Sequence, residues 1–201
     1  MTKDFYIFRH GQSTYNAEGR TQGRTNDSVL TEKGKLQATE AGKILQNRGI
    51  ELIVASPLKR TLQTADLVAA EIGGVPVTTD ERFIEVDVGE IEGMHKKDIW
   101  EKFGEKYALW CAPGEANLDL SFKGGETRRQ VRKRVFVGLD DYVRHNPHQI
   151  IGIASHGVMM RQIVQAINRD SYSIDNCTIM HLRYEDGAYV LVECLNTRDE
   201  K

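Results

Sequence analysis

The stretch FYIFRHGQSTYN, residues 5–16, joins a short apolar run directly to an arginine, a histidine and a glycine. Its first four residues are continuously apolar, as in a strand that is buried on both faces of a sheet. A second apolar run, IIGIA at 150–154, ends in the same way, in SHG at 155–157. Two buried strands that each end in His-Gly predict that the imidazoles of His10 and His156 face one cleft.

Strands and helices are expected to alternate along the chain. The apolar runs predict strands at 4–8, 52–55 and 149–154, each followed by an amphipathic helix, at about 31–48, 58–72 and 157–168. The other expected elements are a short strand near 75–79, an irregular segment 83–93, helices at 95–112 and 124–145, and a hairpin at 177–195. Thr31 and Ser56 are the expected N-caps of the first two helices, with Pro57 at the first helical position. This order predicts an α/β fold, a three-layer sandwich with a mostly parallel central sheet flanked by helices.

The length and composition fit one domain. A chain of 201 residues and 22.7 kDa, with 40% hydrophobic and 28% charged residues, is typical of a globular domain with a sizeable core. We expect residues 1–201 to form this single domain, with a small helical cap insertion at about 86–123. The net charge of −2 gives no bulk attraction to nucleic acid or to an anionic membrane. An anionic ligand therefore needs positive charge that is gathered locally.

The cysteines and the absence of targeting signals predict a cytoplasmic location. The three cysteines are odd in number, widely spaced and without a CxxC pair. This pattern argues against a disulfide framework or a zinc site and favours a reducing compartment. No basic-then-apolar leader precedes the first strand, and no apolar stretch has the length of a membrane span. No metal-ligand spacing such as HExxH is present, so no metal is expected.

The ends of three expected strands are followed by the charged and potentially catalytic side chains. Arg9 and His10 follow the first strand, Arg60 follows the second, and His156 follows the last. Ligands of α/β sheets bind outside the carboxyl ends of the strands, so we expect these side chains in one site. The neighbouring guanidinium of Arg9 should keep His10 neutral, and a neutral imidazole is a good nucleophile towards phosphorus. Arg60 should lie beside a helix N-terminus and away from the apolar stripe of its helix, which favours anion binding.

Six sequence pieces, in order along nearly the whole chain, carry a family resemblance. They are RHGQSTYNAEGRTQG at 9–23, LTEKGKLQA at 30–38, SPLKRTLQTA at 56–65, EVDVGEIEG at 85–93, GGET at 124–127 and SHG at 155–157. With these pieces the chain resembles the histidine phosphatase superfamily, also called phosphoglycerate mutase-like, and in layout its short bacterial phosphatase-type members. The RHG piece alone is a weak signal, whereas six ordered pieces with a second His-Gly are specific. The resemblance implies a phosphoglycerate mutase-like fold.

The resemblance also implies a role for each matching position. His10 matches the nucleophile that becomes phosphohistidine, and Glu85 matches the proton donor for the leaving alkoxide. The positions that match substrate-binding residues are Arg9, Arg60, His156 and Asn16 around the transferring phosphoryl group, and Gln22 and Gly23 at the rest of the substrate. Two arginines and a histidine supply the positive charge that phosphoryl transfer requires, so no cofactor is expected. Glu85 must carry a proton to act as the acid, which partial burial favours; Asp87 is the reserve.

Three functions are open at this point. The first is a metal-independent phosphatase that acts on small phosphomonoesters. The second is a 2,3-bisphosphoglycerate-dependent phosphoglycerate mutase, but mutases of this clan usually follow the acid with Arg-His-Tyr-Gly. This chain has VDVG at 86–89, and we expect Asp87 to repel phosphoglycerate, which favours the phosphatase. The third is a noncatalytic phosphate-binding module, which is disfavoured because the nucleophile, the acid and the phosphate ligands are all present.

The substrate and the partners are less defined. The aromatic residues of the expected cap either line the cleft or only pack the cap; they are Trp100, Phe103, Tyr107, Trp110 and Phe122. Sugar phosphates, nucleotide-derived phosphates and phosphorylated peptides all remain open as substrates, and we expect a monomer or a homodimer. The basic run at 128–134 favours a solvated helix face over nucleic-acid binding, because Val131 and Val135 give it a buried stripe.

Overall fold

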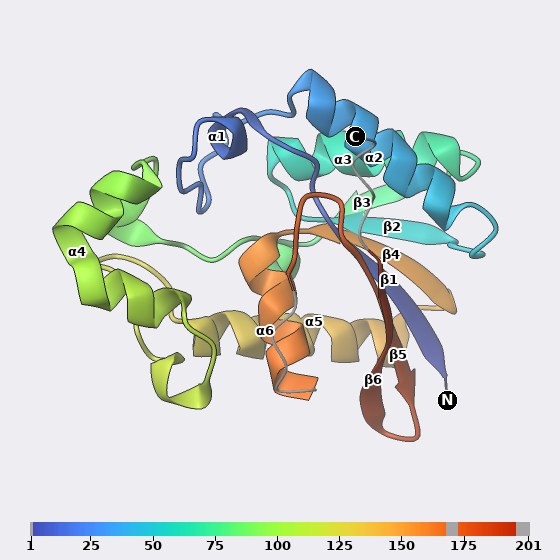
Figure 1. The fold of residues 1–201 in the computed structure, drawn as a ribbon. Helices are drawn as coiled ribbons and strands as arrows, with labels where there is room; N and C mark the ends of the chain where they lie inside the picture. The colour runs from blue at the N-terminus through green and yellow to red at the C-terminus, as the bar shows by residue number, and fades with distance from the viewer. Residues whose placement is uncertain (1, 168–172, 196–201) are drawn as a thin grey trace.

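The computed structural model describes residues 2–167 and 173–195, and in this part of the chain six strands form one sheet (Figure 1). The strands are β1 (Lys3–Arg9), β2 (Leu52–Ala55), β3 (Val77–Thr79), β4 (Ile150–Ser155), β5 (Ile179–Glu185) and β6 (Ala188–Leu195). Their order is β3-β2-β4-β1-β5-β6. The first four pair in parallel, whereas β5 runs antiparallel to β1 and β6 antiparallel to β5. The mixed, mostly parallel sheet confirms the expected α/β fold, and the hairpin expected at the end of the chain is β5–β6.

Helices cover both faces of this sheet (Figure 1). They are α2 (Glu32–Leu45) and α3 (Lys59–Glu71) on one face, and α5 (Arg128–His145) and α6 (Gly157–Ile167) on the other. In β1, Phe5 and Ile7 belong to the core beneath α5 and α6, and Tyr6 and Phe8 to the core beneath α2 and α3. A strand with a core on both sides is apolar at every position, which explains the unbroken apolar run. None of the helices within residues 2–167 and 173–195 combines the length and apolar character of a membrane span.

A smaller group of elements lies to one side of the sheet, at the left of Figure 1. The chain reaches it through two 3₁₀ turns, η1 (Glu81–Phe83) and η2 (Gly89–Ile91). The group contains α4 (Lys96–Cys111) and a further turn, η3 (Glu115–Asn117). The helix expected at 95–112 is therefore present, but it breaks at Gly104, whose φ of 41° and ψ of −114° are not helical. A glycine adopts such a backbone without steric cost.

Some of the expected helix boundaries are confirmed and others differ. The helix expected at 124–145 begins only at Arg128, after its N-cap Thr127. Thr31 caps α2, because its Oγ1 accepts a hydrogen bond from the Gly34 N–H at 3.1 Å. The last helix begins at Gly157 as expected, while residue 168, its expected end, lies outside the described residues. The expected capping of α3 by Ser56 is wrong: the N-cap is Leu58, which makes no side-chain capping bond. Helix α2 ends at Leu45, three residues before the end at about 48 that the pattern predicted.

Candidate active site

His10 follows β1, and its main chain is held by contacts from several sides. The N–H of His10 donates to the Ser155 carbonyl at 3.0 Å, and the His10 carbonyl accepts from Nδ2 of Asn176 at 3.0 Å. Gly11 passes so close to Gly34, near the start of α2, that a Cβ on either glycine would collide with main-chain atoms. These contacts fix the backbone from which the His10 ring projects.

The His10 ring is buried and neutral, with its tautomer set by a main-chain carbonyl. The ring is 2% exposed, and Nδ1 lies 2.7 Å from the Gly11 carbonyl oxygen. A carbonyl only accepts, so Nδ1 carries the proton and Nε2 carries the lone pair. Burial lowers the pKa of His10 well below its ordinary value of 6.5, and Arg60 and then Arg9 lower it further. The neutral form was expected from Arg9, but burial and Arg60 are the larger causes.

The second imidazole lies beside the first. The ring centroids of His10 and His156 are 5.3 Å apart, and the ring planes make an angle of 64°. His156 is fully buried, with Nε2 at 2.7 Å from Oγ of Ser56 and 3.2 Å from Oγ1 of Thr61. The Ser56 hydroxyl therefore bonds His156 instead of capping α3. Burial and then Arg60 lower the pKa of His156 well below 6.5. Unlike His10, His156 is not among the residues that line the cavity, and it has no exposed surface.

Arg9 and Arg60 bring buried positive charge to the same place. Arg60 is 1% exposed, and its two Nη atoms donate to the carbonyls of Thr25 and Gly23 at 2.8 Å each. Nη1 of Arg9 donates to the Ile174 carbonyl, also at 2.8 Å. Burial lowers the pKa of Arg60 to about 10, so this side chain is still charged at neutral pH. Carbonyls orient a guanidinium without neutralising it, which leaves charge available for a phosphate.

Asn16 and Gln22 are oriented by hydrogen bonds to their amide oxygens. Oδ1 of Asn16 accepts from the Ser13 N–H at 3.3 Å and from Nδ2 of Asn176 at 3.1 Å. Oε1 of Gln22 accepts from the Ser13 hydroxyl at 2.8 Å. Both residues line the cavity. With the oxygens engaged, the two amide NH₂ groups are the ones that can donate to a ligand there.

The loop at 22–25 requires a glycine. Gly23 has a φ of 55°, and a Cβ at this position would lie 2.6 Å from Cγ2 of Val88 and 2.7 Å from Oε2 of Glu92. Its carbonyl is one of the two acceptors that hold Arg60. Gly23 thus lines the cavity and also positions the guanidinium.

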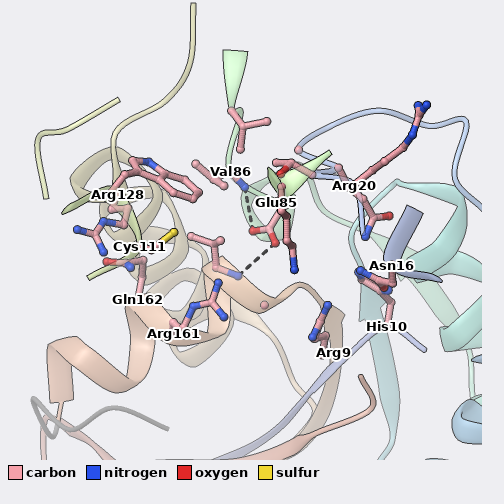
Figure 2. Close-up of a pocket in the computed structure, with 18 of the residues that line it drawn as sticks. Arg9, His10, Asn16, Arg20, Glu85, Val86, Cys111, Arg128, Arg161 and Gln162 are labelled. Carbon is pink, nitrogen blue, oxygen red and sulfur yellow. Dashed lines mark hydrogen bonds between the residues drawn. The ribbon is translucent and has the colours of Figure 1, made fainter. Parts of the chain in front are cut away.

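The carboxylate of Glu85 is held at the N-terminus of α6. Oε2 accepts from the N–H of Val158 at 3.1 Å, and Oε1 accepts from that of Val86 at 3.0 Å (Figure 2). Oε1 also accepts from the N–H of Met159 at 3.2 Å. Because α6 follows β4 directly, its free N–H groups lie at the same edge of the sheet as the two histidines. The half-buried Glu85 lines the cavity together with His10.

The neighbouring acids do not face this cavity. Asp87, Glu90 and Glu92 are absent from its lining, and Oδ1 of Asp87 accepts from the Gly89 N–H at 2.8 Å. The geometry gives no support to Asp87 as a reserve acid. It also removes the reason for expecting Asp87 to repel phosphoglycerate, because this carboxylate lies outside the cavity.

The cavity has a volume of about 390 Å³ and extends well beyond His10. Its lining includes polar residues that the sequence reasoning did not single out: Arg20, Lys96, Arg128, Arg161, Gln162 and Gln165. Three of these form a polar stripe on α6, which is otherwise mostly apolar, and that stripe was a usable signal in the sequence. Arg128 gave no such signal, since it opens a basic run typical of a solvated face. It is 3% exposed, so the expectation of a solvated face is wrong at this position.

The aromatic residues of α4 and the following loop divide between the two expected roles. Tyr107 and Trp110 line the cavity. Phe122 belongs to the hydrophobic core and Phe103 packs against it, while Trp100 is 57% exposed. The segment 96–123 thus borders the cavity with part of its aromatic set and packs with the rest.

Known proteins resemble this chain over nearly its whole length. A model of the histidine phosphatase superfamily (branch 1) matches residues 5–197. Phosphoserine phosphatase 1 of Hydrogenobacter thermophilus is 32% identical over 193 residues, which cover 93% of this chain and 89% of that protein. The probable phosphoglycerate mutase GpmB of Citrobacter koseri is 30% identical, covering 92% and 86%. A solved phosphoglycerate mutase structure from Bacillus anthracis has a TM-score of 0.85 at 21% identity, covering 94% of this chain and 91% of that one, and shows the shared fold.

Proposed function

Because this chain belongs to the histidine phosphatase superfamily, branch 1, and is therefore a phosphatase or a mutase, we propose that it hydrolyses small phosphomonoesters without a metal ion or cofactor. In this proposal His10 is the nucleophile and Glu85 the proton donor. The observation that carries it is the neutral His10 ring, which shares a cavity with Glu85 and the charged Arg9 and Arg60. The 32% identity to a phosphoserine phosphatase supports hydrolysis.

In the first half-reaction, Nε2 of His10 forms a bond to phosphorus while the bond from phosphorus to the leaving oxygen breaks. Arg9, Arg60 and the amide of Asn16 bind the nonbridging oxygens and offset their charge. The carboxyl proton of Glu85 goes to the leaving oxygen, so the product departs as an alcohol. The Gly11 carbonyl, which accepts from Nδ1, stabilises the positive charge that the ring acquires.

In the second half-reaction, a water molecule attacks the phosphohistidine and gives its proton to the Glu85 carboxylate. The P–N bond breaks, phosphate leaves, and His10 returns to its neutral form. The N–H groups of Val158 and Met159 keep the carboxylate in place through both steps. We assign His156 a positioning role, because its Nδ1 lies 3.5 Å from Nη2 of Arg60 and its ring packs against His10.

The test is phosphate release from a panel of phosphomonoesters in the presence of EDTA, with wild type and His10→Ala. We expect release by the wild type and background release by the variant. Activity that appears only on addition of a divalent cation, or that survives in His10→Ala, would contradict the proposal.

A second candidate function is a 2,3-bisphosphoglycerate-dependent phosphoglycerate mutase. Lys96, Arg128 and Arg161 in the cavity favour it, as does the 30% identity to a probable mutase. The two functions separate when 3-phosphoglycerate is supplied with and without 2,3-bisphosphoglycerate. Hydrolysis faster than isomerisation supports the phosphatase, and the opposite supports the mutase.

We also propose that residues 1–201 form one domain, in which 86–123 act as a cap over the cavity. Tyr107 and Trp110, which line the cavity, support this role. Three free cysteines support a reducing, cytoplasmic location. Light scattering on the purified protein distinguishes the monomer from the homodimer.

A further inference from the structure

The guanidinium of Arg60 is held by the loop at 22–25. Its Nη2 donates to the Gly23 carbonyl and its Nη1 to the Thr25 carbonyl, at 2.8 Å each. Its Nε is buried and has no hydrogen-bond partner among residues 2–167 and 173–195. A guanidinium has five N–H donors, and those that the loop does not use can bind a ligand in the cavity that Arg60 lines. The position of the two loop carbonyls therefore sets the direction in which Arg60 presents its charge.

The carboxylate of Glu92 holds the same loop from outside the cavity. Its Oε2 accepts from the N–H of Arg24 at 2.8 Å and from the N–H of Thr25 at 3.1 Å. The Arg24 N–H and the Gly23 carbonyl belong to one planar peptide group. This peptide group therefore donates to Glu92 at one end and accepts from Arg60 at the other. Glu92 is not among the lining residues that the structure describes, so it reaches Arg60 only through the loop.

The peptide group between Gly23 and Arg24 lies between two opposite charges. A carboxylate that accepts from its N–H polarises the peptide, and this strengthens the hydrogen bond that its carbonyl accepts from the guanidinium. Burial lowers the pKa of Arg60 to about 10, and the charges of Glu85 and then Glu92 oppose that change. Both effects favour a charged guanidinium in one fixed orientation.

The backbone around Glu92 is itself fixed next to this loop. The Gly93 N–H donates to the Thr21 carbonyl, and the Thr21 N–H donates to the Met94 carbonyl, at 2.9 Å each. The Glu92 N–H donates to the Gly89 carbonyl, also at 2.9 Å. An exposed carboxylate on a mobile side chain contributes little. The Glu92 carboxylate is exposed, but its main chain is tied to the strand of chain that leads into the loop.

We propose that Glu92 is a positioning residue for Arg60. Its carboxylate fixes the loop at 22–25 through two main-chain N–H groups, and the loop aims the guanidinium at the transferring phosphoryl group. This inference rests on the proposed role of Arg60 in binding that group. Glu92 itself touches neither the substrate nor His10.

Binding of inorganic phosphate to the His10→Ala variant tests this role without turnover. Adding Glu92→Ala should weaken phosphate binding about tenfold in calorimetric titration, because Arg60 loses its fixed direction. Glu92→Gln keeps an acceptor oxygen of the same reach, so its loss should be smaller by about threefold or more. Unchanged affinity in the alanine variant, or equal losses in the two variants, would overturn the inference.

The matched control is Glu90→Ala. Glu90 is exposed like Glu92, and its Oε1 also accepts from a main-chain N–H, that of Lys123 at 3.1 Å, which lies outside the loop that holds Arg60. The control variant should bind phosphate as tightly as its His10→Ala parent. Thermal unfolding of both variants measures any loss of stability. A Glu92→Ala variant that is less stable but binds phosphate like the control would have only a structural role, which contradicts the proposal.

A double-mutant cycle tests whether Glu92 acts through Arg60. Arg60→Lys keeps the positive charge but lacks the planar fork that the two loop carbonyls hold. In the His10→Ala background, the losses of phosphate affinity from Glu92→Ala and Arg60→Lys should combine to less than their product. Losses that multiply would show that the two residues act independently and would remove the proposed link.

Kinetics with His10 intact separate this role from an effect on the acid. Glu92→Ala should reduce kcat/KM for alkyl phosphates and for p-nitrophenyl phosphate by the same factor, because both substrates present the same phosphoryl group to Arg60. A loss confined to alkyl phosphates would place the effect on Glu85 and contradict the inference. A wild type that hydrolyses no phosphomonoester would contradict the phosphatase proposal alone, since phosphate binding still decides the role of Glu92. Absence of phosphate binding by His10→Ala would overturn this inference even if the wild type is a phosphatase.

Discussion

Burial acts on the histidines and arginines of this site with opposite consequences for their charge. It lowers the pKa of His10 and His156 well below 6.5, so both rings are neutral at physiological pH. It also lowers the pKa of Arg60, but only to about 10, because a guanidinium starts far above neutrality. The same buried environment thus produces a neutral nucleophile, His10, next to a charged arginine that can bind phosphate, Arg60. The lone pair and the positive charge coexist because the two side chains differ in intrinsic basicity.

Acidification should destabilise the protein through these two histidines. Their folded pKa values lie below the unfolded value of about 6.5, so the stabilisation is complete above pH 6.5 and is lost as the pH falls further. We expect the free energy of unfolding to decrease by up to about 1.4 kcal/mol per pH unit for each ring. Urea denaturation at pH 5 to 7.5 measures this. His156→Gln should flatten the dependence, whereas His145→Gln, at a side chain 73% exposed, should not. Equal slopes in all three proteins would contradict the account.

Replacing the proposed acid should discriminate between leaving groups. Glu85→Gln retains one of the two acceptor oxygens but has no acidic proton to give to an alkoxide. Alkyl phosphates should therefore slow by about 10² to 10⁴, whereas p-nitrophenyl phosphate, whose phenolate leaves without protonation, should slow far less. Steady-state kinetics on both substrate types measure the difference. Equal losses on the two types would remove Glu85 from the acid role.

The sequence identified the residues at the strand ends but not how deeply they are buried. Positions at strand ends predicted that His10 and Arg60 would share a site, the family resemblance added Glu85, and the structure brings the three to one cavity. The helical pattern suggested that Arg60 and Arg128 point away from apolar stripes, yet both are almost fully buried. A second layer of chain covers both side chains. The loop at 22–25 lies over Arg60, and the segment 112–117 lies over Arg128. Periodicity within a single helix carries no information about such a layer.

At the scale of elements, two arginines from separate segments converge on the main chain of Glu85, and a glutamate from a third segment joins them. Nε of Arg24 and Nη2 of Arg134 both donate to the Glu85 carbonyl, at 3.2 and 3.1 Å. Glu126 joins the two arginines, with Oε1 at 2.9 Å from Nε of Arg134 and Oε2 at 3.1 Å from Nη2 of Arg24. The carboxylate end of Glu85 is held by α6 and its backbone by this ion-pair cluster. Glu126, the glutamate of the GGET piece, thus helps to hold the backbone of the proposed acid.

Glu126→Gln should disturb the position of the proposed acid, Glu85, while leaving the residues that bind the phosphoryl group in place. Loss of the carboxylate leaves two part-buried arginines unpaired and loosens the Glu85 backbone. We expect kcat for alkyl phosphates to fall about tenfold, with a smaller loss for p-nitrophenyl phosphate. The control is Glu90→Gln, at an exposed acid in the 85–93 piece, and this variant should keep the wild-type ratio between the two substrates. A variant that loses only thermal stability, with both substrates affected alike, would argue against this positioning role.

The N-cap predicted for α3, the helix that carries Arg60, is wrong. Ser-Pro before an apolar stripe normally predicts an N-cap, as it did for α3. The Ser56 hydroxyl instead lies 2.7 Å from His156, a residue that arrives from the opposite end of the chain. Local patterns predicted the capping of α2 by Thr31 correctly. The Thr31 hydroxyl donates to Gln12 and still accepts from the Gly34 N–H, so its distant contact leaves the cap in place. The competing partner of Ser56 becomes visible only in three dimensions.

At the scale of the whole molecule, strand order creates the site. β1 lies between β4 and β5, so the strand that ends at Arg9 pairs along its length with the one that ends at Ser155. Apolar runs predicted parallel strands buried on both faces, but the order of a sheet depends on how its connections cross. The charge distribution has the same origin. A chain with net charge −2 lines one cavity with six arginines and lysines and, among its described residues, one acid, because five distant segments each contribute an arginine or a lysine.

The most direct test of the account is the position of the phosphoryl group in the trapped intermediate. Rapid quenching during turnover of p-nitrophenyl phosphate, followed by mass spectrometry and ³¹P NMR of the phosphorylated peptide, identifies both the residue and the ring nitrogen. The account predicts acid-labile phosphohistidine at His10 on Nε2, since Nδ1 donates to the Gly11 carbonyl. Phosphate on Nδ1, on any other residue, or no phosphoenzyme at all during turnover would contradict it.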